Sequence, residues 1–263
     1  MAKIDAIGDV NDVTLAPFFS HRSELPEDWR GYFREHDLLV SYLHDPDGIF
    51  GANIRRCTDS TFLSGPSQIE NGGMHAAAQL ASPFAELGVA VDDFAPRLHF
   101  MPERIAAAQA KLGCTPVLAL HPGSGSPRKN WPISSWISLI EHLVQRTDRV
   151  MAIAGEADST QIAALRGKFG ERLHYAIGWP LYDLGAILRQ TIFVGHDSGI
   201  SHLAAASDAR CTILFGPTKS EVWAPPGENI SVLRAAGDDL NRLPLTEVCA
   251  KVDQELIRIG IST

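Results

Sequence analysis

Two polar, glycine-bearing loops carry the residues that could do chemistry in this sequence. The first loop, HDSG at residues 196–199, follows the short apolar run 191–194 and precedes the small-residue run 199–206. Asp197 and Ser198 are residue types that suit the start of a helix. A helix start directs N–H groups and a partial positive charge into the loop, which favours a phosphate there. The alternative is a strand–helix joint without a ligand.

Glycines flank this first loop on both sides. Gly195 and Gly199 have no Cβ, so we expect the backbone to turn sharply and to approach a ligand closely. Ser198, Gly199 and nearby amides would then receive the phosphates, with His202 close behind on the same helix. Asp197 cannot itself favour an anion, so we expect it to hold the turn by hydrogen bonds or to bind a hydroxyl group of the ligand (a sugar hydroxyl, if the resemblance described below holds).

The second loop, HPGSGSPRKNWP at residues 121–132, follows another apolar run, 117–120. Ser124 and Ser126 offer hydroxyls to a phosphate, and Gly125 (with Gly123) lets the backbone come close. Lys129 can stabilise the charge that grows on a leaving phosphate, with Arg128 as the competing cation. The alternative is a solvated basic pair at a helix start, where positive charge is mildly unfavourable. Loops that follow parallel strands share one edge of the sheet, where open α/β sheets bind ligands.

Three segments together resemble glycosyltransferase family nine, the ADP-heptose:lipopolysaccharide heptosyltransferases and their relatives. They are HPGSGSPRKNWP, VGHDSGISHLAAA and FGPTKSEVWAPPG, in that order. The resemblance is strong over residues 115–227 and weaker over 37–112. It implies a GT-B-like α/β fold in which two Rossmann-like domains face a cleft. The K-x-W-P part of the first segment favours Lys129 over Arg128 as the phosphate cation.

The resemblance also implies where the nucleoside would be held. The segment AGEAD, residues 154–158, is similar to the family segment whose carboxylate holds the ribose. Glu156 and Asp158 compete for that role, and a helix cap is the alternative for Asp158. The segment WPL, residues 179–181, resembles the apolar lining of the adenine pocket, which places Leu181 there.

The general base is expected in the amino-terminal half. Gly8 and Asp9 resemble the family's Gly-Asp loop, whose aspartate is the proposed base, although the preceding strand is short and Pro17 follows later than in the family pattern. Asp45, Asp47 and His75 are the alternatives to Asp9.

The activity implied is an inverting, metal-independent transfer of a sugar, most simply heptose from ADP-heptose, to a lipopolysaccharide core or related glycan. The nucleotide sugar is a co-substrate, and no cofactor is expected. The first domain looks shorter than the family's by roughly one βαβ unit, either as a trimmed variant or because the chain begins partway into the domain. The alternative function is therefore a catalytically impaired nucleotide-sugar-binding module with an incomplete acceptor domain.

Other site types are disfavoured. His196 and His202 are six positions apart, which puts them on different faces of a helix and argues against a metal site with Asp197. The G-x-G of the second loop lacks the third glycine of a dinucleotide fingerprint. The sequence GHDSG does not match G-x-S-x-G either, so a serine-hydrolase site is not predicted.

Composition limits the class of protein and its location. The formal net charge of −8 over 263 residues argues against general nucleic-acid binding. No apolar run approaches the roughly 20 residues that span a bilayer, and no signal peptide is evident. The 4 cysteines are scattered without a C-x-x-C pair, which predicts reduced thiols. We expect a cytoplasmic protein, associated at most peripherally with the inner face of the cytoplasmic membrane.

The spacing of apolar runs predicts a doubly wound parallel sheet in the second half. The domains are expected at residues 1–112, an acceptor-side α/β domain, and 113–263, a nucleotide-sugar-binding Rossmann-like domain with a terminal helix. Strands are expected near 117–120, 150–154, 173–177, 191–195, 211–215 and 230–233. Helices are expected near 26–35, 75–87, 102–112, 134–146, 158–168, 181–189, 199–206 and 246–259, with a further strand at 37–43.

Overall fold

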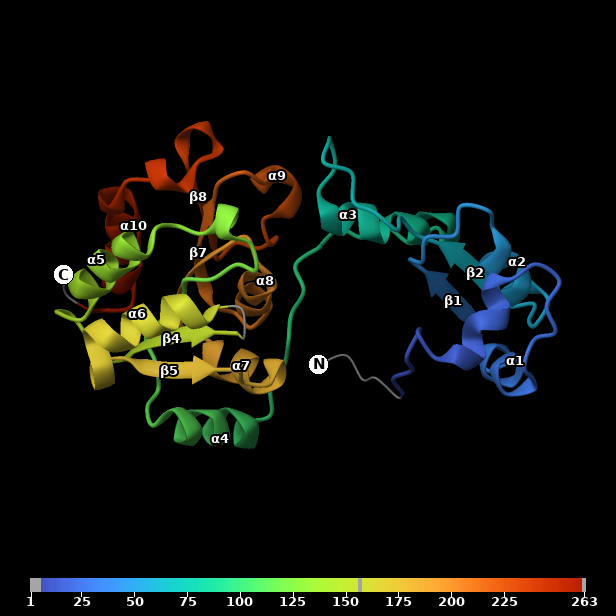
Figure 1. The fold of residues 1–263 in the computed structure, drawn as a ribbon, viewed down its shortest axis with the longest axis horizontal. Coiled ribbons are helices and arrows are strands. Elements are labelled where there is room, and N and C mark those ends of the chain that lie inside the picture. The colour runs from blue at the N-terminus through green and yellow to red at the C-terminus, as the bar shows by residue number, and fades with distance from the viewer. Residues whose placement is uncertain (1–5, 156–157, 262–263) are drawn as a thin grey trace. The chain divides into compact units, whose positions relative to one another are not determined.

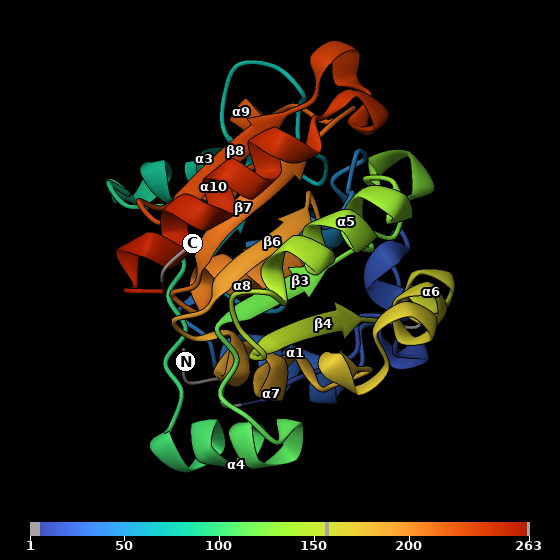
Figure 2. The same cartoon turned by 90° about the vertical axis from the view of Figure 1, so that its left-hand side faces the viewer.

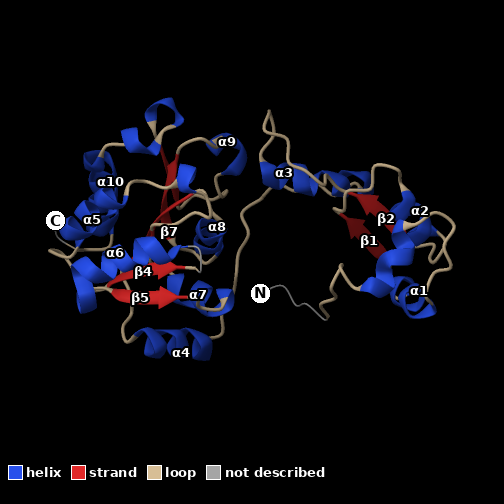
Figure 3. Cartoon of the chain, viewed as in Figure 1, coloured by secondary structure: helices blue, strands red, loops and turns tan. Residues whose placement is uncertain are grey.

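The computed structural model describes residues 6–155 and 158–261, and they form a mixed α/β fold with parallel sheets (Figure 1). The chain divides into two compact units, residues 2–94 and 95–263. Each unit is described separately below, and Figure 3 distinguishes their helices, strands and loops. The α/β class with parallel sheets that the sequence predicts is confirmed.

The larger unit is built on a 6-stranded parallel sheet with the strand order β5-β4-β3-β6-β7-β8. The strands are β3 (Leu118–His121), β4 (Val150–Ala154), β5 (His174–Ile177), β6 (Ile192–His196), β7 (Arg210–Phe215) and β8 (Ile230–Arg234). Strands β3, β4 and β6 are buried along their whole length. This is why they read as continuous apolar runs rather than as alternating patterns.

Helices cover both faces of this sheet, giving three layers (Figure 2). The helices are α4 (Pro102–Leu112), α5 (Ile133–Leu143), α6 (Ser159–Phe169), α7 (Leu181–Leu188), α8 (Gly199–Ala206), the short α9 (Ser220–Trp223) and α10 (Leu245–Arg258). One apolar core joins α5, α6 and α10 to the face that carries Leu118 and Leu120. A second core joins α4, α7 and α8 to the opposite face, which carries Ala119 and Met151. The single-turn 3-10 helices are η3 (Pro127–Lys129), η5 (Gly170–Arg172), η6 (Ala236–Asp238) and η7 (Leu240–Arg242).

The smaller unit contains a 2-stranded parallel sheet among the residues that the structure describes. Its elements are η1 (Val13–Phe19), α1 (Glu27–Arg34), β1 (Leu38–Ser41), α2 (Ile49–Arg55), β2 (Thr61–Ser64), α3 (Ala76–Ala81) and η2 (Ser82–Leu87). Strands β1 and β2 pair in register from Leu38 with Thr61 to Ser41 with Ser64. Its core mixes aliphatic and aromatic side chains, with Phe18 fully buried against Phe33 and Phe50.

The boundary between the units lies between Phe94 and Ala95 rather than at residues 112–113. Helix α4 belongs to the larger unit because Ala108 and Leu112 pack into the same core as Ile187 of α7. The connecting chain is fixed there as well, since Leu98 N donates to the Ala206 carbonyl at 2.7 Å.

The predicted strands and helices of the larger unit are confirmed to within a few residues, as are α1, β1 and α4. Helix α3 is shorter than expected and continues as the 3-10 helix η2. The elements η1, α2 and β2 were not predicted. Among the described residues, no helix is long and apolar enough to cross a membrane.

Candidate functional site

The two chemistry-bearing loops lie side by side at the carboxyl edge of the larger sheet. They follow β3 and β6, which pair directly, with His121 opposite Gly195. From β3 the chain continues towards β4 and β5, whereas from β6 it continues towards β7 and β8. The loops therefore flank the point at which the strand order reverses, where doubly wound sheets bind their ligands.

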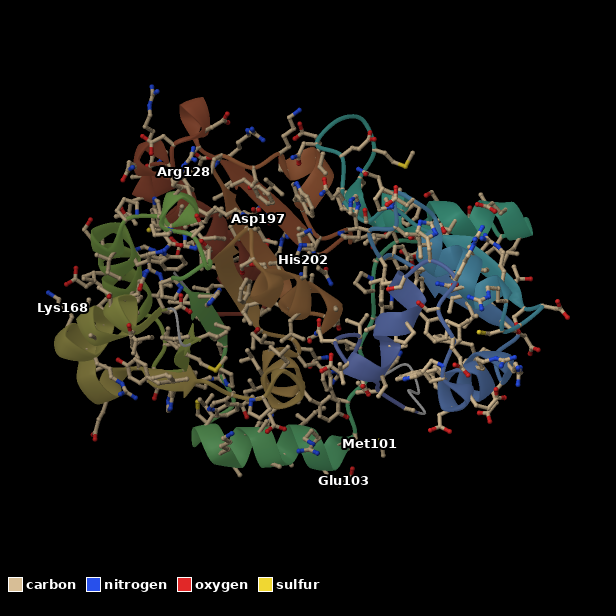
Figure 4. All side chains as sticks on the ribbon, turned by 45° about the vertical axis from the view of Figure 1, so that its right-hand side comes forward. Met101, Glu103, Arg128, Lys168, Asp197 and His202 are labelled. Atoms are coloured by element: carbon tan, nitrogen blue, oxygen red, sulfur yellow. The ribbon has the colours of Figure 1, made fainter. Side chains whose placement is uncertain are left out.

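An ion pair joins the two loops. Lys129 Nζ lies 2.7 Å from Asp197 Oδ2, and the two side chains are 30 % and 10 % exposed. Arg128, the competing cation, is exposed on η3 (Figure 4). Lys129 is therefore the cation that the fold directs to the switch point, and Asp197 is the group that holds it.

The sequence analysis expected the serines of the β3 loop to offer their hydroxyls to a phosphate, but the Ser124 hydroxyl is bonded within the loop. Ser124 Oγ lies 2.5 Å from Asn130 Oδ1 and 2.9 Å from the Ser126 carbonyl, so its hydroxyl is engaged within the loop. Gly125 has a φ of 68°, a left-handed conformation that favours glycine. Ser126 is half-buried, and its carbonyl also accepts from Lys129 N at 3.0 Å. These bonds shape the loop that presents Lys129.

A buried histidine fastens the same two loops together. His196 is 0 % exposed and ends β6. Its Nε2 accepts from the Trp131 backbone N–H at 2.8 Å, and its Nδ1 lies 3.2 Å from the Gly123 carbonyl, to which it donates. Burial lowers the pKa of His196 to about 3. The ring is thus neutral with its proton on Nδ1, and it acts as a fixed link rather than as a metal ligand or base.

A Ser–His–Asp arrangement also crosses the sheet edge, with a different histidine and aspartate from those adjacent to Ser198 in sequence. His121 Nε2 lies 3.4 Å from Asp158 Oδ2, and His121 Nδ1 lies 3.4 Å from Ser198 Oγ. Asp158 Oδ2 also accepts from Gly155 N at 2.8 Å. A Cβ at Gly123 would lie 1.7 Å from Asp158 Oδ1, so this carboxylate packs directly against the loop backbone.

The environment of Asp158 differs from that of a ribose ligand. It is 5 % exposed, and its carboxylate is directed at His121 and Gly155 N inside the fold. The cap alternative is not observed either, because Asp158 occupies the N-cap position of α6 without a side-chain cap hydrogen bond. Glu156, the competing ribose candidate, lies outside the described residues.

The start of α8 presents its first turn to the site. Ser198 is the N-cap and makes no side-chain cap hydrogen bond. His202 N donates to the Ser198 carbonyl at 3.3 Å, which places His202 in the first turn behind the loop (Figure 4).

The prediction that the backbone turns sharply at Gly195 and Gly199 is wrong. Gly199 has helical geometry as the first residue of α8, with open space where a Cβ would be. Gly195 lies within β6, and its lack of a side chain accommodates the Phe193 ring, 2.7 Å from an added Cβ.

Apolar side chains lie further along the same edge, beyond β5. Leu181 is the first residue of α7 and is 63 % exposed, and Ile177 at the end of β5 is 38 % exposed. Between them, the Trp179 ring has Lys111 Nζ 4.3 Å from its centroid. Ile177 and Leu181 thus expose apolar side chains at this edge, a kind of surface that a nucleobase can contact.

The base candidates all lie in the smaller unit. Asp9 is exposed, and its Oδ1 accepts from Asn11 N at 2.9 Å in a local turn. The Asp45 carboxylate is engaged, because it accepts from Phe50 N and Gly51 N at the start of α2. Asp47 lines a cavity of about 380 Å³. His75 caps α3, with Nδ1 accepting from Ala77 N at 3.1 Å.

His121 is a site residue that the sequence analysis did not single out, and His196 was weighed there only as a possible metal ligand. Both end a buried strand of the central sheet, and that position is the signal that could have identified them. Among the described residues, no group of three or more His, Cys, Asp or Glu side chains is arranged to hold a metal ion.

Comparisons with known proteins agree with this geometry. The chain is similar to lipopolysaccharide heptosyltransferase 1 of Escherichia coli O18:K1:H7, with 29 % identity over 46 % of this chain and 37 % of the relative. It is also similar to lipooligosaccharide heptosyltransferase 2 of Haemophilus influenzae, with 26 % identity over 57 % of this chain and 45 % of the relative. The matching region thus spans less than half the length of these curated relatives.

Solved structures share the fold. A family 9 glycosyl transferase from Veillonella parvula superposes with a TM-score of 0.71 at 16 % identity, covering 88 % of this chain and 76 % of that one. The ADP-heptose heptosyltransferase II of E. coli gives 0.67 at 16 % identity, covering 94 % and 88 %. E. coli heptosyltransferase WaaC, solved with ADP, gives 0.63 at 19 % identity, covering 87 % and 76 %.

The family model for glycosyltransferase family 9 (heptosyltransferase) matches residues 60–246, which include both loops and the whole central sheet. With these loops at the switch point of a doubly wound sheet, the chain belongs to glycosyltransferase family 9.

Proposed function

We propose that this chain is an inverting, metal-independent glycosyltransferase that transfers heptose from ADP-heptose to a lipopolysaccharide core or related glycan. The observation that carries the proposal is the Lys129–Asp197 ion pair, which places a held cation beside the α8 N-terminus at the switch point. A cation and a helix start together stabilise a diphosphate, both as a ligand and as a leaving group.

In the proposed reaction the acceptor hydroxyl attacks the anomeric carbon on the face opposite the diphosphate. The new C–O bond forms while the anomeric carbon–phosphate oxygen bond breaks, and its electron pair leaves with the nucleoside diphosphate. The hydroxyl proton passes to a base, for which Asp9 is the candidate. Lys129 stabilises the negative charge that develops on the leaving oxygen.

The exposed apolar side chains of Ile177 and Leu181 support contact with a nucleobase, and the solved structures whose names include ADP or ADP-heptose support ADP as the nucleotide. The test is a calorimetric screen of ADP, UDP, GDP and CDP against the purified protein, followed by transfer assays with ADP-heptose in the presence of a chelator. Binding of ADP above the others, with transfer that the chelator leaves intact, is expected. Preference for another nucleotide, or loss of transfer that a divalent ion restores, would contradict the proposal.

The second candidate function is a nucleotide-sugar-binding module without transfer activity. The observation that favours it is the 2-stranded sheet of the smaller unit, within the described residues, which offers little scaffold for an acceptor site. The test is an assay of several nucleotide sugars and acceptors. If the protein binds the donor but neither transfers its sugar nor hydrolyses it, the binding module is supported over the enzyme.

A further inference from the structure

A chain of three polar side chains crosses the carboxyl edge of the larger sheet. Asp158 follows β4, His121 ends β3 and Ser198 follows β6, and these strands are neighbours in the order β4-β3-β6. His121 and Asp158 are 4 % and 5 % exposed, whereas Ser198 is half-buried at the start of α8. These three side chains thus connect the inside of the fold to the loop at which the diphosphate is proposed to bind.

The hydrogen-bonding capacity of these groups fixes where the protons lie. The hydrogen bond with His121 is the largest cause that lowers the pKa of Asp158, so its carboxylate is ionised and only accepts. His121 Nε2, at 3.4 Å, must therefore carry a proton. In a neutral imidazole Nδ1 is then an acceptor, and it accepts a hydrogen bond from the Ser198 hydroxyl.

A phosphate oxygen beside Ser198 changes which arrangement is favoured. While the Ser198 hydroxyl donates to His121, it directs only lone pairs at the phosphate, which also accepts. If His121 gains a second proton, Nδ1–H donates to Ser198 Oγ, and the hydroxyl proton can be donated to the phosphate. The imidazolium charge adds an attraction for the same anion.

We propose that His121 takes up one proton from solvent when a nucleoside diphosphate binds, and that this proton turns the Ser198 hydroxyl into a donor to the phosphate. The inference rests on the proposed function, because it needs the diphosphate at this loop. His121 and Asp158 are positioning residues here, since of these three side chains Ser198 is the one that contacts the diphosphate.

The charges around His121 favour this uptake. Asp158 faces the ring from the start of α6 and supplies the anion that stabilises an imidazolium. His196 faces it from the end of β6, but burial keeps that ring neutral, with a pKa of about 3. Asp197, next to Ser198, is neutralised by Lys129. Ser198 Oγ also lies 3.4 Å from Ser201 Oγ, whose own proton is donated to the His196 carbonyl.

The experiment is titration calorimetry of the full chain with ADP at about pH 8, where the second ionisation of a phosphate group (pKa about 6) is essentially complete. The binding enthalpy is measured in buffers of different ionisation enthalpy, and the slope gives the number of protons taken up. We expect a net uptake of protons for the unmutated protein, with about one proton as the upper limit, since one imidazole changes state.

Three variants assign the proton. His121→Asn keeps a polar group that cannot change charge, and it should abolish the uptake and weaken ADP binding about tenfold or more. Asp158→Asn keeps an oxygen for Gly155 N but removes the charge, so the uptake should fall although the loop retains its shape. The third variant is Ser198→Ala, alone and combined with His121→Asn. Adding His121→Asn to Ser198→Ala should weaken ADP binding much less than His121→Asn weakens it in the unmutated protein, because the two side chains act as one unit.

The outcomes separate this inference from the function on which it rests. Binding of ADP by the unmutated protein without proton uptake overturns the inference and leaves the proposed function intact. Uptake that persists in His121→Asn also overturns it, because another group then takes the proton. A protein that binds none of the four nucleoside diphosphates overturns both.

Discussion

Lys129 Nζ lies 2.7 Å from Asp197 Oδ2, so one ion pair links the loop after β3 to the loop after β6. An ammonium group has three N–H donors in fixed tetrahedral geometry, and Asp197 takes one of them. The aspartate is nearly buried, at 10 % side-chain exposure, and it therefore holds the cation in place before any ligand arrives. We expect this pair to govern both the affinity for a diphosphate and the stability of the two loops.

Replacement of Lys129 by alanine should weaken ADP binding by about 1.5–3 kcal/mol, the range for a charge-assisted hydrogen bond. It should also lower the free energy of unfolding by about 1 kcal/mol, because the Asp197 carboxylate loses its partner. Titration calorimetry and denaturant unfolding measure the two effects. Arg128→Ala is the matched control, since that cation is exposed one position away. Equal losses of affinity in the two variants would remove Lys129 from its special role.

Replacement of Asp197 by asparagine should strengthen ADP binding, about tenfold, because it removes a negative charge beside the phosphates. The asparagine oxygen can still accept from Lys129, so the cation keeps its position. The measurement is the ADP dissociation constant at low and high salt, with a smaller gain at high salt. Weaker binding in this variant would show that Asp197 contacts the ligand directly.

Substitutions at Gly199 and at Gly123 should differ in their effect on the stability of the fold. Gly199→Val adds a side chain into open space at the first residue of α8, so the variant should fold normally but exclude a phosphate from the helix start. Gly123→Ala would place a Cβ 1.7 Å from Asp158 Oδ1, and the loss of unfolding free energy should exceed about 2 kcal/mol. Thermal unfolding and ADP titration of both variants check this. If Gly199→Val binds ADP like the parent, the α8 start is only a structural joint.

The sheet of the larger unit could be predicted because its central strands are buried on both faces and read as apolar runs between loops. Helix α2 could not be predicted in the same way. Its N-cap is Gly48 in a left-handed conformation, and the capping carboxylate comes from Asp45. Gly51 inside the helix, where a Cβ would meet the Phe62 ring at 3.1 Å, weakens the helical pattern further.

The donor loops were identified from sequence, but their internal contacts were not. By resemblance, Asp158 was one of two candidates for the ribose, with Glu156 as the other, whereas the fold directs Asp158 at His121, 37 residues away. The link from Trp131 to His196 spans 65 residues. Which histidine of a loop becomes buried depends on such long-range contacts, and no local pattern encodes them.

The buried imidazole of His196 should make stability depend on pH. Its pKa is about 3 in the folded protein, below the ordinary value of 6.5. Between these values the unfolded chain binds a proton that the folded chain does not, so the unfolding free energy falls as the pH falls, by about 1.4 kcal/mol per unit at most. The stabilisation from the neutral His196 ring is therefore complete above about pH 6.5, the ordinary pKa, and is lost as the pH falls towards the pKa of about 3 in the folded protein.

His196→Gln keeps an acceptor for Trp131 N–H but cannot be protonated. It should lower stability at neutral pH by about 1–3 kcal/mol, because the donor to the Gly123 carbonyl is lost. The range from about pH 6 to about pH 4 lies between the pKa of His196 in the unfolded chain and its pKa in the folded protein. Over this range the unfolding free energy of the variant should fall less than that of the parent. Denaturant unfolding followed by tryptophan fluorescence measures both slopes. Identical slopes would mean that the imidazole is not held neutral.

The general base is tested by Asp9→Asn, which keeps the shape of the side chain and its acceptor for Asn11 N. If Asp9 takes the proton of the acceptor hydroxyl, turnover should fall about 100-fold or more, while ADP affinity stays at the parental value. Asp12→Asn is the matched control, because Asp12 is a neighbouring exposed aspartate whose Oδ1 likewise accepts a backbone N–H, from Thr14 at 2.9 Å. Removal of its charge should leave turnover near the parental rate. If Asp9→Asn also keeps that rate, the base lies elsewhere, and Asp47 is the next candidate because the Asp45 carboxylate is already bonded to the start of α2.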